Sequence, residues 1–386
     1  MVLPLVLGLL CSEYAEMLLA SSYEGTVTSL SLTTSGHNHG LTTLSQTTDC
    51  GSSPSWMTVD GENDILYCLD EGVDLPNATL TSFKINPNGS LAGLDQLQTT
   101  TGPVASAFYE PADAPGHKFL AIAHYTGSAV TTYSVDPVSG HFNHSQTFAF
   151  TLSGPGPVTS RQDAPHPHGV IVDPTGEFVL VPDLGADLVR IFHIHPTTGH
   201  LEEQQPLVVA PGSGPRHGVF WVSDQANANQ SYDSRFYLVN ELDNYLRGYD
   251  VTYSANGTIL FSESYKGNTF GGSTPPAGSK VAEIAISPEK NNLVISNRND
   301  TTFGPEHDSI ALFSIADAVS FRGLYPAYGS FPRHFEFSPE GDMVAIALQN
   351  SHKVAVVEWD RKNSSFGPLL VERQLEGEVT AVFWDL

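Results

Sequence analysis

The sequence predicts an all-β protein, a seven-bladed β-propeller with four antiparallel strands in each blade. Two observations lead to this prediction. A pattern of paired apolar strands recurs along the chain at a nearly regular spacing. The composition also suits many short strands joined by tight turns, since the 386 residues include 34 Gly and 26 Pro while only 15% are charged. No long amphipathic helix pattern competes with it.

Six segments carry the repeat, each as a hairpin of two apolar strands that is preceded by a Pro or a small residue. They start near residues 54, 103, 165, 215, 281 and 332, so successive starts lie 49 to 66 residues apart, as expected for four-stranded blades with two insertions. The hairpins are 54–59 with 66–68, 104–108 with 119–122, 168–172 with 178–181, 217–221 with 236–239, 281–286 with 293–296, and 333–337 with 343–347.

The turns and outer strands support the same interpretation. Asp173-Pro174-Thr175-Gly176 and Ser338-Pro339-Glu340-Gly341 have the preferences of type I turns. Third strands follow, as at 188–192, 309–313 and 353–357, and a more polar fourth strand closes each unit.

The seventh blade is predicted to be split between the two ends of the chain. Residues 379–384 supply one strand, and residues 17–21, 26–30 and 41–44 supply the other three. The ring would then close where the C-terminal strand pairs with N-terminal ones. Because opening the ring would expose strand edges, residues 17–386 are predicted to form one domain.

The chain begins with a short apolar run, Val2 to Cys11, that is too short to span a bilayer and suits a signal peptide. We therefore expect residues 1–16 to be a signal peptide and the mature protein to be extracellular, with no membrane attachment. Seven Asn-x-Ser/Thr sequons agree with secretion and are candidates for glycosylation. They begin at Asn77, Asn88, Asn143, Asn229, Asn256, Asn299 and Asn363.

Loss of Cys11 with the signal would leave Cys50 and Cys68 as an even pair in an oxidising compartment. A disulfide between them is a candidate, with two buried free thiols as the alternative. No cysteine spacing indicates a zinc site or a catalytic thiol.

The charge balance narrows the possible partners. Forty-two acidic residues against 17 basic ones give a net charge of −25, which would repel nucleic acid and anionic lipid surfaces. If an anionic small molecule binds, arginines must be concentrated around it.

Candidate site residues meet at one rim of the ring. In an antiparallel blade, the start of the innermost strand and the end of the second strand lie at the same rim. Strand starts carry His166, His168, Arg216, His217, Arg333 and His334, and second-strand ends carry Glu71, His124, Asp183, Glu241, Arg298 and Gln349. Converging arginines in an acidic chain indicate a carboxylate or another anionic ligand.

Other roles for these residues remain open at this point. The arginines could bridge neighbouring blades, and the histidines could serve only in Pro-rich turns. His166 and His168 with His217 or His334 could also supply three nitrogens to a metal, but no carboxylate has an evident ligand spacing, so we expect neither a metal nor a cofactor. The chain has no G-x-S-x-G, Walker or dinucleotide-binding motif, which leaves acid/base and electrostatic catalysis.

The stretch from Pro165-His166-Pro167-His168-Gly169 through Asp187 resembles the lactonase family of 6-phosphogluconolactonases and carboxymuconate-lactonizing enzymes. Gly214-Pro215-Arg216-His217, Val239-Asn240-Glu241-Leu242, Ser296-Asn297-Arg298 and Pro332-Arg333-His334 follow in the family's order. The resemblance covers the chain after residue 16 and implies a seven-bladed propeller. The predicted secretion would make this chain a fungal-like secreted member.

The resemblance also implies a chemistry and residues for it. The pocket of the carboxymuconate-lactonizing members contains His, Arg, Glu and Arg, which match His168, Arg216, Glu241 and Arg298 here. We expect His168 to act as general acid/base, with Glu241 as its partner or as the base that positions water, and Arg216, Arg298, Arg333 and His217 to bind the substrate.

These residues would hydrolyse a sugar lactone or interconvert a carboxymuconate and its lactone. Secretion favours an unphosphorylated aldonolactone, because phosphorylated gluconolactone is an intracellular metabolite. The alternative is a non-catalytic extracellular propeller that binds a glycan, an anionic small molecule or a protein at its mouth.

Overall fold

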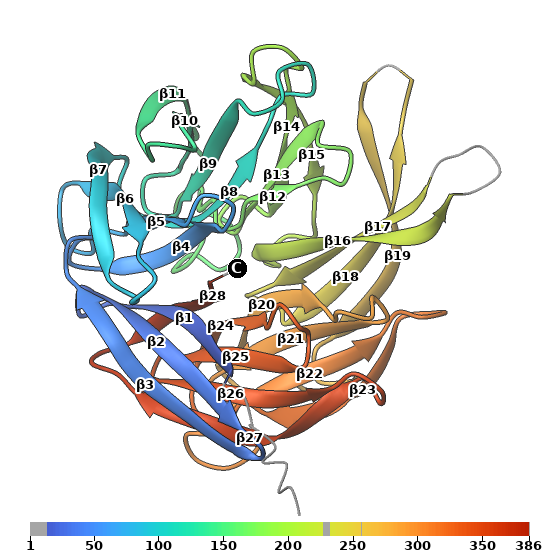
Figure 1. Ribbon diagram of the computed structural model, residues 1–386. Coiled ribbons are helices and arrows are strands. Elements are labelled where there is room, and N and C mark those ends of the chain that lie inside the picture. Colours follow the sequence, from blue (N-terminus) through green and yellow to red (C-terminus); the bar gives the residue numbers. More distant parts are fainter. Residues whose placement is uncertain (1–13, 227–231, 256, 386) are drawn as a thin grey trace, which may run out of the picture.

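The protein forms a closed ring of seven four-stranded antiparallel sheets, which confirms the predicted β-propeller (Figure 1). This computed structural model describes residues 14–226, 232–255 and 257–385. Within these ranges there is no helix, and so none that could cross a membrane.

The first three complete blades are consecutive in sequence. Their strands, from the inside of the ring outward, are β4 (Pro54–Asp60), β5 (Ile65–Asp70), β6 (Ala78–Ile85) and β7 (Leu91–Thr99); β8 (Pro103–Tyr109), β9 (Lys118–His124), β10 (Ala129–Val135) and β11 (Phe142–Ala149); and β12 (Ile171–Val172), β13 (Phe178–Asp183), β14 (Leu188–Ile194) and β15 (Leu201–Val208).

Three further blades follow in the same order. They consist of β16 (Pro215–Ala226), β17 (Tyr232–Asn240), β18 (Tyr245–Tyr253) and β19 (Ile259–Asn268); β20 (Lys280–Ile286), β21 (Asn292–Arg298), β22 (Ser309–Ser314) and β23 (Ser320–Pro326); and β24 (Pro332–Phe337), β25 (Met343–Leu348), β26 (Lys353–Asp360) and β27 (Ser365–Gln374).

The seventh blade joins the two ends of the chain, as predicted. Its innermost strand is β28 (Val379–Trp384), followed by β1 (Tyr14–Ser22), β2 (Thr26–Ser35) and β3 (Asn38–Thr47). β28 pairs with β1 from Leu18↔Trp384 to Ser22↔Val379. The Ser21 and Thr380 hydroxyls form a buried 2.8 Å hydrogen bond across this junction.

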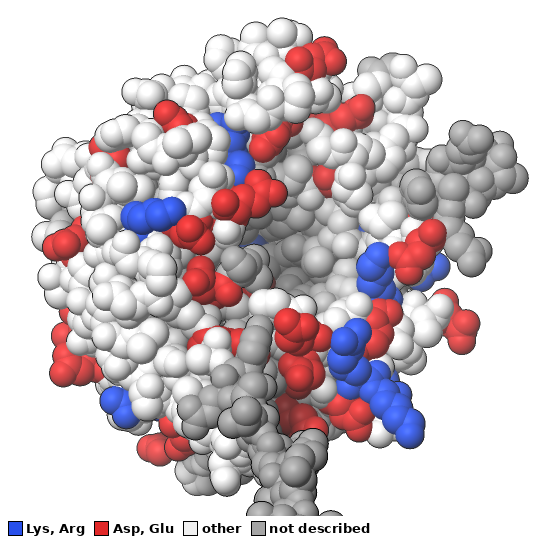
Figure 2. All heavy atoms as spheres, viewed as in Figure 1, with Lys and Arg blue, Asp and Glu red and all other residues white. Residues whose placement is uncertain are grey.

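The apolar core lies between neighbouring blades rather than on the ring axis. One cluster, for example, packs Ala121 and Val130 of one blade against Val179 and Phe192 of the next. Each sheet therefore buries both faces, which explains why second strands such as β5 and β25 are buried along their whole length. The axis itself is left to a channel, and Figure 2 shows one face of the ring hollowed at its centre, with acidic side chains around the hollow.

One predicted strand is much shorter in the structure. Residues 168–172 were expected to form an inner strand, but β12 contains only Ile171 and Val172, with an isolated bridge between Pro167 and Asp183. Two prolines at 165 and 167 remove backbone donors. Gly169 then lies so near the Arg216 carbonyl that a Cβ on it would come within 2.8 Å of that oxygen.

Cys50 and Cys68 are joined by a disulfide with a Cα–Cα distance of 5.9 Å. Five of the seven sequon asparagines, at positions 77, 88, 143, 299 and 363, are solvent-exposed, and Asn229 and Asn256 lie outside the described residues. Of the expected signal peptide, residues 1–13 also lie outside that range, while residues 14–16 begin β1. The signal and the glycans therefore stay predictions.

Candidate active site

A cavity of about 300 Å³ opens at the rim where inner strands begin and second strands end. It is formed by residues of several blades, most of them polar. Its lining consists of Glu71, Val104, Tyr125, Arg161, His168, Arg216, Glu241, Lys280, Arg298, Phe331 and Arg333.

A β-bulge recurs at the start of the inner strands and helps to aim the arginines. In β16 the pairing passes from Pro215↔Asn240 to His217↔Val239, so Arg216 is the extra residue. In β24 it passes from Pro332↔Leu348 to His334↔Ala347, which makes Arg333 the extra residue there. A bulged residue leaves the ladder, and its side chain is redirected. This local irregularity brings both guanidinium groups to the cavity.

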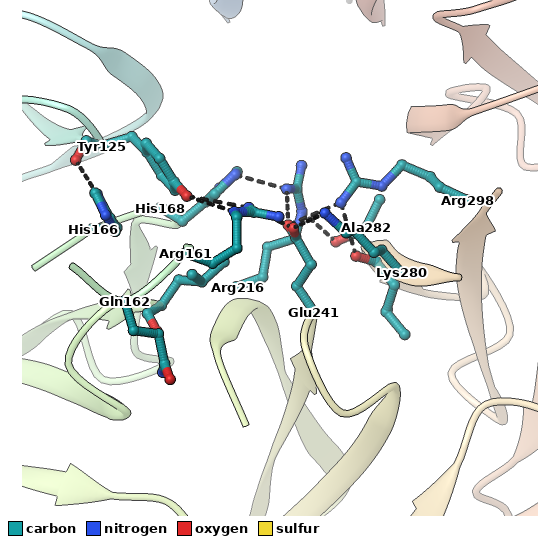
Figure 3. Close-up of polar contacts among 12 residues, drawn as sticks. Tyr125, Arg161, Gln162, His166, His168, Arg216, Glu241, Lys280, Ala282 and Arg298 are labelled. Carbon is teal, nitrogen blue, oxygen red and sulfur yellow. Dashed lines mark hydrogen bonds and ion pairs between the residues drawn. The ribbon is translucent and has the colours of Figure 1, made fainter. Parts of the chain in front are cut away.

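The Glu241 carboxylate is the centre of the site. It follows the end of β17, is almost fully buried, and receives three guanidinium groups from different parts of the chain (Figure 3). Arg161 Nη2 lies 2.6 Å from Oε1, while Arg216 Nη1 and Arg298 Nη2 each lie 2.8 Å from Oε2. Lys280 Nζ is farther away, at 4.0 Å from Oε1.

The surrounding charges decide the ionisation of this carboxylate. Burial alone would raise the pKa of Glu241, but the four cations around it, Arg298 foremost, lower that pKa far below its usual range. Burial and the neighbouring charge of Arg298 lower the pKa of Arg216 to about 9, which still leaves the guanidinium protonated at neutral pH. Glu241 is therefore an ionised anchor for the arginines.

The cavity is strongly positive although the protein is strongly acidic. Five cations and two carboxylates line it, an excess of three positive charges. Arg333 has no carboxylate within 4 Å among the described residues; its guanidinium faces the Tyr23 ring at 5.3 Å, and the charges of Glu71 and Glu241 act on it from farther away. Tyr23 in turn donates a 2.5 Å hydrogen bond to Glu71. Such a site attracts an anion or a group that becomes anionic during reaction.

His168 lies beside Arg216 in the same wall. Arg216 Nη1 donates to His168 Nε2 over 2.7 Å, and Arg216 Nε donates to the Ala282 carbonyl over 3.0 Å. Burial lowers the pKa of His168 well below its usual value, and the charge of Arg216 lowers it further. The imidazole is therefore neutral at physiological pH.

Most of the predicted site residues meet in this cavity. His168, Glu241, Arg216, Arg298 and Arg333 all line it. His217, which was also predicted to bind the substrate, does not line this cavity; it lies behind His168 and lines a smaller cavity deeper in the channel. The reason is the bulge, which turns Arg216 toward the mouth and the next residue toward the channel interior.

The sequence analysis missed several residues of the lining. Arg161 belongs to the insertion between β11 and β12, which has no counterpart in the other blades, and its Nε donates to the Tyr125 hydroxyl over 3.2 Å. Lys280 is the first residue of β20, at the place where β4, β8, β16 and β24 begin with proline, so its position at a strand start could have identified it.

Among the histidines weighed as metal ligands, His168 contacts His217 through ring nitrogens 3.1 Å apart, whereas His166 and His334 have other partners. His166 Nδ1 contacts the Tyr125 carbonyl at 2.7 Å, and His334 packs edge-on against Trp56. Within the described ranges no group of three His, Cys, Asp or Glu side chains is arranged to hold a metal ion.

Comparison with known proteins agrees with this architecture. The chain is 32% identical to a probable 6-phosphogluconolactonase of Arthroderma benhamiae over 82% of this chain and 76% of the relative. It is 29% identical to a 6-phosphogluconolactonase of Formosa agariphila over 84% of this chain and 86% of that relative. The structure of a periplasmic gluconolactonase of Pseudomonas aeruginosa superposes with a TM-score of 0.77, covering 96% of this chain and 99% of that one at 22% identity. The model of the lactonase family of seven-bladed β-propellers matches residues 17–383, and the chain belongs to that family.

Proposed function

We propose that the protein hydrolyses an aldonolactone in the cavity around Glu241. The observation that carries the proposal is the excess of three positive charges in a cavity of about 300 Å³. This volume is at the small end of ligand sites, which suits one sugar ring rather than an oligosaccharide. The relatives are named as a probable 6-phosphogluconolactonase and a 6-phosphogluconolactonase, which supports hydrolysis of a sugar lactone.

The reaction needs stabilisation of negative charge and transfer of a proton. Water attacks the lactone carbonyl carbon while His168 accepts one of its protons, which gives a tetrahedral oxyanion. The ring C–O bond then breaks, the ring oxygen takes this proton from His168, and the aldonic acid releases the second water proton to solvent to become the carboxylate. Arg216, Arg298 and Arg333 surround the space in which these anionic oxygens would lie. Pre-oriented guanidinium donors in a buried site stabilise such charge strongly.

Glu241 and His168 have different roles in this scheme. The low pKa of Glu241 makes it a poor proton acceptor, so its role is to hold the guanidinium groups in place. His168 Nε2 is the candidate acceptor for the proton of the attacking water. In the structure the Nε2 lone pair of His168 accepts a 2.7 Å hydrogen bond from Arg216 Nη1. Substrate binding therefore has to draw Arg216 toward the anionic oxygen of the substrate before His168 Nε2 can accept a proton.

We further propose that the protein is extracellular and acts on an unphosphorylated lactone. The apolar start of the chain, the Cys50–Cys68 disulfide and the five exposed sequon asparagines support this location. Phosphorylated sugar lactones are intracellular metabolites, so secretion favours the unphosphorylated compound. A mobility shift on treatment with an endoglycosidase, for protein recovered from the medium of expressing cells, tests the location.

Hydrolysis of gluconolactone and of 6-phosphogluconolactone above the spontaneous rate tests the activity. Removing a key group, as in Arg216→Ala and His168→Ala, should lower kcat/KM about 100-fold or more. Arg373→Ala, an exposed arginine of β27, is the control and should leave the rate unchanged. A preference for the phosphorylated lactone would contradict the substrate choice. Turnover of neither compound would overturn the hydrolysis and leave carboxymuconate cycloisomerisation or non-catalytic binding.

A further inference from the structure

The proposed hydrolysis leaves two buried ionisable residues behind His168 without a role. His217 and Glu283 are 6% and 7% exposed, respectively, and line a cavity of about 120 Å³ in the channel, together with Trp56. They belong to different blades, since His217 is on β16 and Glu283 on β20. Burying an ionised carboxylate beside a histidine is costly unless the two form a specific arrangement.

A continuous line of hydrogen bonds joins these residues to the active-site cavity. Glu283 Oε1 lies 2.8 Å from His217 Nδ1, and His217 Nε2 lies 3.1 Å from His168 Nδ1. His168 Nε2 then lies 2.7 Å from Arg216 Nη1. Each imidazole therefore uses both of its ring nitrogens within the line.

The chemistry of the two ends fixes the position of every proton between them. A guanidinium can only donate, so His168 Nε2 must accept and the proton of this neutral ring is on Nδ1. That Nδ1–H donates to His217 Nε2, which places the second proton on His217 Nδ1. The ionised Glu283 carboxylate can only accept, and it accepts this proton's hydrogen bond. With both rings neutral, no other order satisfies all three contacts.

We propose that Glu283, acting through His217, is a positioning residue that holds His168 in the Nδ1–H tautomer with its Nε2 lone pair directed at the cavity. The kinetic effect of this positioning rests on the proposed lactone hydrolysis, whereas the positions of the protons follow from the hydrogen bonds alone. Arg216 also favours the Nδ1–H tautomer of His168, but only while its guanidinium donates to His168 Nε2. When a bound anion draws Arg216 away, Glu283 is the group that still fixes it.

The surroundings of Glu283 are consistent with this assignment. Its Oε1 also accepts from the Ile284 backbone N–H at 3.0 Å, whereas its buried Oε2 has no hydrogen-bond partner among the described residues. The carboxylate is therefore oriented by the histidine line and the backbone. The other ionisable groups near it are His334 and Glu336 of β24, which take no part in the line.

The proton order can be measured without turnover, by 15N NMR of protein with labelled imidazoles. We expect both His168 and His217 to be neutral with the proton on Nδ1. In Arg216→Ala, His168 should keep this tautomer because Glu283 remains. In the double variant Arg216→Ala/Glu283→Gln, the carboxamide can donate as well as accept, and His168 should become a mixture of tautomers. A proton on His168 Nε2 in the unmodified protein, or an unchanged tautomer in the double variant, would overturn the proposal.

The kinetic consequence is tested with Glu283→Gln alone. Its kcat for the lactone should fall about 10-fold to 100-fold while KM stays within about two-fold, because general acid–base catalysis is lost and binding is not. Glu336→Gln, the same change on the neighbouring inner strand, is the matched control and should leave kcat and the tautomers unchanged. Equal losses in both variants would show a structural effect and contradict the proposal. If no lactone is turned over, the proposed function fails, and the tautomers still decide the proton order.

Discussion

The two ends of the central channel are built from the same inner strands but have opposite chemistry. At one end the first residues of these strands and their neighbours supply five cations and two carboxylates. Farther along β12, β16 and β20, a mainly apolar groove of about 790 Å³ has a lining that includes Ile171, Val219, Phe220, Trp221 and Ile284. Position along the strand therefore determines the role of a residue. Residues at the bulged start of an inner strand line the candidate active site, and residues of its regular part pack against neighbouring blades.

Two carboxylates, Glu241 and Glu336 of β24, show a second contrast. Glu241 is surrounded by cations that lower its pKa, whereas burial raises the pKa of Glu336 to about 7, with its Oε2 accepting only the Trp384 backbone N–H at 2.8 Å among the described residues. The same residue type is thus an ionised anchor at one position and, at the other, a group that takes up a proton near neutral pH.

Glu241→Gln should have the largest effect on stability. It leaves Arg161, Arg216 and Arg298 together without their carboxylate, and removing one partner of a buried ion pair costs about 3–5 kcal/mol. We expect a loss of this size in the free energy of unfolding from urea titration, together with loss of activity. At pH 5, where Glu336 is protonated in the folded protein, the loss in Glu336→Gln should stay below about 1 kcal/mol, because the amide resembles the protonated acid. Similar losses in the two variants would remove the distinction between the two carboxylates.

The pH dependence of stability should separate the same two residues. Between the ordinary pKa of a Glu and the raised pKa of about 7, Glu336 is protonated in the folded protein and ionised in the unfolded chain, so its contribution to stability falls as pH rises from about 4.5 to 7. Relative to wild type, Glu336→Gln should gain about 1–3 kcal/mol across this range. Glu241 acts in the opposite direction, since its stabilisation is lost as pH falls below about 4.5. Urea titrations at pH 5 and pH 7.5 measure the difference, and parallel curves for variant and wild type would contradict it.

Arg333→Ala should affect binding more than stability. This guanidinium has no carboxylate within 4 Å among the described residues, so its removal leaves no buried counterion unpaired. A charge-assisted contact to the substrate is worth about 1.5–3 kcal/mol, and we expect KM to rise about 10-fold or more with Tm nearly unchanged. Steady-state kinetics and thermal unfolding of Arg333→Ala and of the Arg373→Ala control give the comparison. A large drop in Tm would assign Arg333 to the scaffold.

Trp221→Ala should have the smallest effect on activity. Its Nε1 donates to the Lys290 carbonyl over 2.7 Å, and the ring lies in the apolar groove, far along β16 from Arg216. We expect kcat/KM for the lactone to remain within about two-fold of wild type, with a modest loss of stability from the removed side chain. A large fall in kcat/KM would show that the two ends of the channel are coupled.

Much of the fold follows from local patterns, because each blade repeats the same alternation and the same turns. The site was predicted in part for the same reason: His168, Arg216 and Arg333 occupy equivalent starts of inner strands. Arg161 could not be placed, because it belongs to an insertion without a repeat to align. The position of His217 outside the cavity was not predicted, since a one-residue bulge reverses the direction in which successive side chains point and leaves no trace in the residue pattern.

The pairing of β28 with β1 has a consequence for biosynthesis. Residues 379–384 form the last strand to leave the ribosome, yet this strand is the innermost one of the blade that contains β1, β2 and β3. During synthesis the inner edge of β1 therefore stays unpaired while the other six blades are made. Such an edge is open to association with other chains. Closure of the ring is accordingly the step at which folding competes most directly with aggregation, and a chain ending before residue 379 should accumulate in that open form.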